Sequence, residues 1–184
     1  MTRTGVAAAL AFTAIAAMTF AEPARSGAQS EAAAVQEIDR LDQAVTDAWV
    51  KAPLTERRAI FVESPVETYG AWRERPDNVF KPGEDLLTYV EPVGYVWRDA
   101  GEGWFGFGFV MDFKVKTPDG RILGGQDAYK RFEFKTRYRN REVFINLKMS
   151  LSGIPAGDYV LVYTLHDLES EKSSSFEQPF RIAS

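Results

Sequence analysis

The feature that most constrains this chain is a strict alternation of large apolar residues with small or polar ones. From 105 to 115 every odd position is a phenylalanine, methionine or valine, and most even positions are glycine, aspartate or lysine. Successive side chains of a β-strand point to opposite faces, so this pattern predicts a strand with one buried and one solvent-facing side. The alternation recurs at 132–138, 143–151 and 176–182.

One further run differs from these. Between Tyr159 and Leu168 both the odd and the even positions are largely apolar. A strand of this kind is covered on both faces, which predicts a central position in its sheet.

Turn-forming sequences separate the runs. Pro118-Asp119-Gly120 predicts a hairpin between strands near 103–116 and 121–138, and Glu169–Lys172 predicts a second, tight one. Arg139-Asn140 can turn the next pair of strands, and Pro155–Asp158 marks another reversal.

Shorter strands are expected near 58–63 and 85–91. We therefore predict a mainly β domain over residues 54–184, an antiparallel Ig-like β-sandwich of about seven or eight strands.

One amphipathic helix is predicted before this domain, at about 31–50 within a leader segment of 29–53. Ser30 can cap its start, and Pro53 lies just past its end. Apolar residues recur at spacings of three and four along one face: Ala34, Ile38, Leu41, Val45, Ala48 and Trp49. We expect this stripe to pack on the sheet domain, the alternative being a partner helix.

Residues 1–28 have the order of a secretory signal peptide. Arg3 precedes an apolar run from Val6 to Phe20, and small residues follow at two possible cleavage sites, Thr19–Ala21 and Ser26–Ala28. The run is shorter than the ~20 residues of a membrane-spanning helix. The expected location is periplasmic or extracellular, with no transmembrane segment in the mature chain.

Composition narrows the function classes further. The chain has no cysteine, which excludes disulfides, thiolate catalysis and cysteine metal sites. Its formal net charge of −4 disfavours nucleic acid as a partner, because that requires a basic footprint. The sequence contains no closely spaced series of acidic residues of the kind that binds calcium. We expect no cofactor and no metal.

Three segments together resemble a known type of module: Phe80–Glu84 before a strand, the Val115–Leu123 hairpin, and Leu147–Ile182 at the end. Their order resembles Ig-like β-sandwich modules of bacterial secreted proteins, including the macroglobulin-like type, and uncharacterised exported proteins with a helix before such a module. The resemblance covers about residues 58–183 and implies binding or structural work more often than catalysis.

Aromatic residues gather around a glycine-rich loop at 98–103. The candidate ligand-binding residues are Tyr95, Trp97 and Trp104, with Trp72 in an earlier loop. Alternation leaves Trp104 on the face opposite Phe105, where its ring could stack on a sugar or grip an apolar ligand. The alternative is that the helix covers these rings. Gly106 and Gly108 could let a ligand or another backbone approach closely, or they could only accommodate packing against the helix.

His166 is the only histidine. Catalysis would require a nucleophile such as Ser173, Ser174 or Ser175 and an orienting acid, and no nucleophile-elbow motif occurs. A hydrogen-bonded structural histidine is the simpler interpretation, so no catalytic residue is assigned.

Basic residues are dense between Lys130 and Arg141, and alternation places Arg131, Lys135, Arg137 and Arg139 on the solvent face. They could attract anionic lipid headgroups or polysaccharide, or they could form a solvated face that prevents edge pairing.

The preferred hypothesis is a non-catalytic binding or interaction module of the cell envelope, with a protein, polysaccharide or apolar ligand as partner. The alternatives are a small secreted hydrolase and a structural subunit that assembles through an edge strand.

Overall fold

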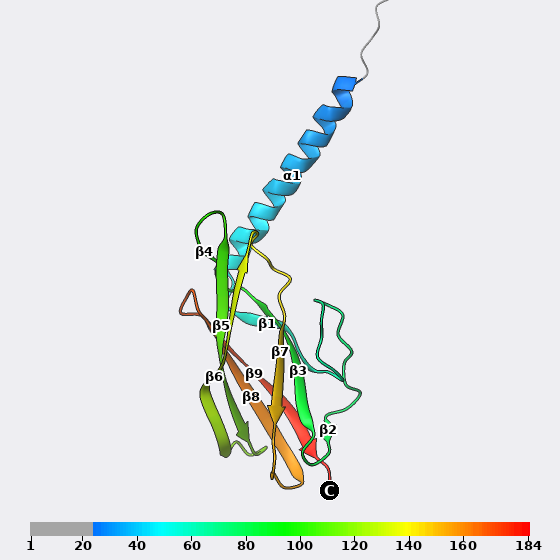
Figure 1. Cartoon of the computed structure of the whole chain (residues 1–184), viewed down its shortest axis with the longest axis vertical. Helices are drawn as coiled ribbons and strands as arrows, with labels where there is room; N and C mark the ends of the chain where they lie inside the picture. The colour runs from blue at the N-terminus through cyan, green and yellow to red at the C-terminus, as the bar shows by residue number, and fades with distance from the viewer. Residues whose placement is uncertain (1–23) are drawn as a thin grey trace, which may run out of the picture. The chain divides into compact units, whose positions relative to one another are not determined.

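The computed structural model describes residues 24–184, so the predicted signal run and its first cleavage site lie outside the described residues. Helix α1 (Ala24–Lys51) crosses the boundary, between Leu41 and Asp42, of two compact units. It is followed by nine strands in the described chain (Figure 1). The prediction of a mainly β chain preceded by one helix is confirmed.

The predicted helix start is wrong, because α1 begins at Ala24 and Ser30 lies within it. Ser30 lies just before the alanine run 32–34, and alanine is the strongest helix former, but the helix extends further back through residues 24–30. A serine tolerated inside a helix gives no start signal. The predicted end is correct, since α1 ends at Lys51, just before Pro53. In the first unit, Arg40 pairs with Glu37 at 2.8 Å.

Within the second unit, the buried face of α1 differs from the predicted stripe. Val45 and Ala48 are exposed, whereas Thr46 and Trp49 are buried. Trp49 is the largest apolar side chain of this stretch, and its indole N–H donates to the backbone oxygen of Tyr95 at 3.0 Å. The need to bury one large ring therefore decides which face of these turns packs.

The β-strands form two sheets. A three-stranded antiparallel sheet has the order β1 (Thr55–Phe61), β3 (Asp85–Val93) and β7 (Ile145–Ser150). The six-stranded sheet is built around β5 (Phe105–Lys116), β8 (Gly157–Asp167) and β9 (Ser173–Ile182). It also contains β2 (Val79–Phe80), β4 (Arg98–Asp99) and β6 (Ile122–Thr136).

Both predicted hairpins are present. β5 pairs with β6 across the Pro118–Gly120 turn, in which the Gly120 amide donates to the Thr117 carbonyl at 2.9 Å. β8 pairs with β9, and β8 lies between β5 and β9 as its apolar sequence predicts. The outer residues Val160 and Val162 are half-buried rather than fully covered.

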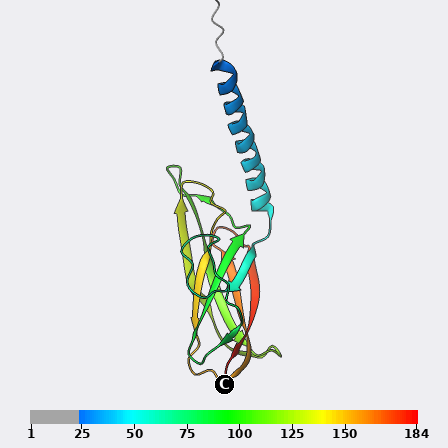
Figure 2. The same cartoon turned by 90° about the vertical axis from the view of Figure 1, so that its right-hand side faces the viewer.

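Two expectations about pairing are wrong. β6 and β7 do not pair across Arg139-Asn140, because β7 pairs with β3 in the other sheet. The described sheets are also not wholly antiparallel, since β2 pairs with β9 in parallel. Figure 2 shows the strands of the second unit from another side. β2 comes from the long connection after β1, and Asn78 ties that connection to the carbonyl of Pro179 at 3.0 Å.

One cluster of buried side chains draws on both sheets. The odd-numbered residues Phe107, Phe109 and Met111 of β5 join it, together with Leu86 of β3 and Leu147 of β7. Between the sheets, the buried Thr88 hydroxyl donates to the side-chain oxygen of Gln178 at 2.8 Å. The burial of these apolar side chains makes the largest favourable contribution to the stability of the second unit.

Candidate functional site

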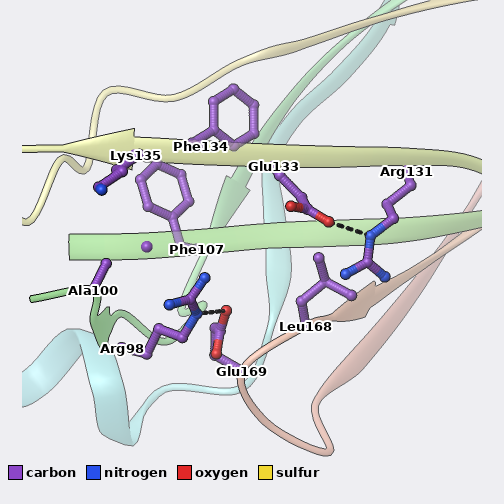
Figure 3. Close-up of a pocket in the computed structure, with 10 residues that line it drawn as sticks. Arg98, Ala100, Phe107, Arg131, Glu133, Phe134, Lys135, Leu168 and Glu169 are labelled. Carbon is purple, nitrogen blue, oxygen red and sulfur yellow. Dashed lines mark hydrogen bonds and ion pairs between the residues drawn. The ribbon is translucent and has the colours of Figure 1, made fainter. Parts of the chain in front are cut away.

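A shallow groove of about 390 Å³ lies on the outer side of β5 and β6, near the start of β5 (Figure 3). We call it the basic groove. Its charged lining residues come from β4, β6 and the β8–β9 turn: Arg98, Arg131, Glu133, Lys135 and Glu169. Alternation along β6 turns residues 131, 133 and 135 outward, as the sequence predicts.

Gly106 forms part of the wall of the basic groove, and its missing side chain shapes the groove. A Cβ at this position would lie 3.0 Å from the guanidinium carbon of Arg98. Arg98 therefore lies flat against the strand where a side chain would otherwise stand. In this structure the group that approaches Gly106 closely is the chain's own Arg98.

Gly108 has a different neighbour. A Cβ there would lie 2.3 Å from the backbone oxygen of Phe132 and 2.8 Å from Leu168. The Gly108 carbonyl also accepts the Leu168 amide at 3.0 Å, so the β8–β9 turn closes onto this strand. The absence of a side chain at Gly108 thus allows β6 and the β8–β9 turn to pack closely against β5.

Two ion pairs neutralise four of the five charged side chains that line the basic groove. Arg98 pairs with Glu169 at 2.8 Å, and Arg131 pairs with Glu133 on the same strand. Lys135 makes no ion pair with any residue of the described chain. The groove therefore keeps one uncompensated positive charge, although the whole chain is acidic.

Trp104 stands beside the basic groove, at the end of the β4–β5 hairpin. Positive φ angles at Gly101, Glu102 and Gly103 form this tight hairpin, and the Trp104 amide donates to the Gly101 carbonyl at 2.9 Å. The hairpin therefore fixes the direction of the half-buried indole.

Two cations lie over the Trp104 ring. The guanidinium of Arg137 is 4.1 Å from the ring centroid, and the ammonium of Lys135 is 5.3 Å from it. Arg137 also donates to the Glu102 carbonyl at 2.7 Å, which holds it over the ring. Cation–π attraction orders both side chains.

The other predicted ligand-binding residues lie elsewhere. Tyr95 is fully buried, and its hydroxyl donates to the Asn140 carbonyl at 2.6 Å. Burial raises the pKa of Tyr95 above its ordinary value. Because no part of its side chain is accessible to solvent, Tyr95 is a residue of the hydrophobic core.

Trp97 is half-buried and stacks on Trp49 of α1, with ring centroids 5.7 Å apart. The helix thus covers this ring, as the alternative interpretation of the sequence expected. Trp72 packs in a separate small cluster near Val62, with Arg58 over its ring at 4.3 Å. The structure therefore leaves Trp104 as the one of the four residues that borders the basic groove.

His166 has a carboxylate partner. Its Nε2 lies 2.7 Å from Asp112, on the outer face of β5 and β8. Partial burial favours the neutral form of Asp112, but hydrogen bonds from the Ala128 amide and from His166 outweigh it and lower the pKa of Asp112. Within the described chain no serine hydroxyl hydrogen-bonds to His166, although Ser173 is its cross-strand neighbour.

Sequence reasoning did not single out Arg98 as a site residue. Its place depends on the pairing of β4 with β5, which only the folded chain brings about. The available signal was Gly106, since a glycine inside a strand often marks a close approach.

Across residues 24–184, no group of three or more acidic or histidine side chains is placed to hold a metal ion. The helix in this part of the chain is not apolar enough over sufficient length to cross a bilayer. The family models and the curated proteins compared with this sequence do not match it.

Proposed function

We propose that this protein is an exported, non-catalytic binding module of the cell envelope, and that the basic groove with Trp104 contacts an anionic polysaccharide. The fold we propose is an Ig-like β-sandwich, similar to macroglobulin-like modules. The core shared by the two sheets and the Thr88–Gln178 hydrogen bond between them support this arrangement.

The observation that carries the proposed function is the unpaired Lys135 over the ring of Trp104. Indole rings stack on sugar rings through their apolar faces, and ammonium and guanidinium groups attract carboxylates. An acidic sugar polymer presents both features at a regular spacing. An open groove at the surface suits a chain-like ligand better than an enclosed small molecule.

The test is titration of the purified protein with an oligogalacturonate, followed by tryptophan fluorescence. We expect binding that weakens with added salt, because charge attraction between exposed groups is screened. Trp104→Leu and Lys135→Gln should each weaken binding about tenfold, the range of one aromatic or charged anchor. Trp72→Leu is the matched control and should bind as the unmodified protein does. A neutral oligosaccharide of the same length that bound equally well would contradict the proposed ligand class.

A small hydrolase is the second candidate, and the Asp112–His166 pair is the observation that favours it. The His166 side chain is 45% exposed, and it lines neither the basic groove nor the arginine-rich hollow described below. General base catalysis requires a nucleophile within hydrogen-bond reach of the imidazole. We therefore predict that His166→Ala leaves oligogalacturonate binding intact. Hydrolysis of a chromogenic ester or glycoside that disappears in folded His166→Ala would replace the binding hypothesis.

A further inference from the structure

A second hollow, of about 720 Å³, lies between the last turns of α1 and the segment that joins β6 to β7. Four arginines line it, and we call it the arginine hollow: Arg57, Arg137, Arg139 and Arg141. The acidic residues of its lining are Asp42 and Glu142. The hollow thus carries more positive than negative side chains in a chain whose net charge is −4.

The backbone that carries three of these arginines is held in place. The Asn140 carbonyl accepts hydrogen bonds from the Tyr95 hydroxyl at 2.6 Å and from the Trp97 indole at 3.2 Å. Arg141 pairs with Asp42 and donates to the Thr46 hydroxyl at 3.0 Å. Buried aromatic residues and α1 therefore fix the segment before any ligand binds.

The neighbouring guanidinium groups are also ordered. Arg139 lies over the ring of Phe105 at 4.7 Å, as Arg137 does over Trp104. Stacking uses the flat face of a guanidinium and leaves its N–H edge available for an oxyanion. Arg57 donates to the Tyr69 hydroxyl at 2.9 Å.

These three arginines are not neutralised by carboxylates. In the described chain none of Arg57, Arg137 and Arg139 makes an ion pair, whereas Arg141 does. Ordered arginines without acidic partners, around one hollow, are the arrangement that binds a multiply charged oxyanion.

We propose that the arginine hollow is a binding site for phosphate monoester groups. A phosphate monoester has three terminal oxygens and up to two negative charges, so it can accept hydrogen bonds from more than one guanidinium at once. A carboxylate has two oxygens and one charge and satisfies fewer of the available donors. Tyr138, 79% exposed at the rim, offers a ring for the remainder of the ligand.

The test is calorimetric titration of the purified protein with glucose 6-phosphate, with glucose as the uncharged control. We expect binding of the phosphate ester alone, and a loss of affinity of about tenfold or more in Arg57→Gln/Arg139→Gln. Both side chains are exposed, and circular dichroism checks that the variant folds. Arg121→Gln is the matched control, because Arg121 is an exposed arginine on the distant β5–β6 turn.

A second arm identifies the source of the phosphate. Vesicles that contain phosphatidic acid are compared with vesicles of phosphatidylcholine alone. Binding to glucose 6-phosphate indicates a soluble ligand, whereas Arg57- and Arg139-dependent binding to phosphatidic acid vesicles alone indicates a lipid headgroup. Absence of both, or binding that the double variant retains, would overturn the proposal. Lys135→Gln should leave phosphate binding unchanged, because Lys135 lines the basic groove and not the arginine hollow, so the two sites are tested separately.

Discussion

The ammonium group of Lys172, in the β8–β9 turn, lies 2.7 Å from the carbonyl oxygen of Ala52, just past the end of α1. The same ammonium donates to the carbonyls of Val50 and Gly94, each at 2.7 Å. The last carbonyls of a helix have no partners within the helix, and they carry the negative end of its dipole. Lys172 thus donates hydrogen bonds to carbonyl groups at the end of α1 and links them to Gly94 within the second unit.

Replacement of Lys172 by methionine should lower the free energy of unfolding by about 2–3 kcal/mol, since a charged donor is removed and three carbonyls lose their partner. Urea denaturation measures the change. Lys130→Met, on the exposed strand β6, is the control and should change stability by less than about 0.5 kcal/mol. Equal effects of the two substitutions would show that the three hydrogen bonds add nothing.

Gly108→Ala should destabilise the protein by about 3 kcal/mol, at the upper end of what overpacking costs, because the new Cβ would meet the backbone oxygen of Phe132. A backbone atom in a paired strand cannot move away without disturbing the ladder. Gly106→Ala should cost less, since Arg98 is a flexible side chain that can shift.

Gly124→Ala serves as the control for both glycine substitutions. Gly124 also lies in a strand, has no positive φ, and has open space where a Cβ would stand. Its replacement should leave thermal unfolding unchanged or raise the midpoint slightly. A midpoint for Gly108→Ala within a degree or so of the control would mean that β5 and β6 can separate freely.

The sequence predicts β5 and its hairpin with β6 well because the signals are local. Each odd residue of β5 is large, and Pro118–Gly120 has the chemistry of a turn. Pairing between distant segments carries no such signal. The Arg139-Asn140 turn is recognisable, but its sequence does not reveal that β7 pairs with β3.

The residues of the candidate site also fall into those that a local pattern reveals and those that only folding brings together. Trp104 could be named because alternation places it opposite Phe105. The position of Arg98 depends on Gly106 and on β4–β5 pairing, and the covering of Trp97 depends on Trp49, far away in the sequence. The start of α1 was misplaced because a capping residue and a helix-interior serine look alike in one sequence.

The buried hydrogen bond between Thr88 and Gln178 gives a prediction about how the two sheets are joined. Thr88→Val should cost about 1–3 kcal/mol, because the Gln178 amide would remain buried without its donor. The double variant Thr88→Val/Gln178→Met should recover most of that loss in urea denaturation, since removal of both polar groups leaves nothing unsatisfied. A double variant as unstable as the sum of the two single variants would contradict this explanation.

Asp112 gives a prediction that depends on pH. Its carboxylate accepts the Ala128 amide at 2.7 Å and lies 2.7 Å from His166 Nε2. Ala128 has a positive φ of 48°, where the β5–β6 register shifts. The charged carboxylate therefore stabilises this irregular piece of backbone.

Because the pKa of Asp112 is lowered in the folded protein, its contribution to stability is present above the unfolded pKa of about 3.9. It is lost as the pH falls through the lower folded value. Asp112→Asn should thus cost about 1 kcal/mol at neutral pH, and the difference from the unmodified protein should shrink below about pH 4. Urea denaturation at neutral and at acidic pH measures both values. Asp127→Asn, with an exposed side chain on β6, is the control. If the loss of stability in Asp112→Asn were the same at acidic as at neutral pH, the charge of Asp112 would not be what stabilises the irregular backbone at Ala128.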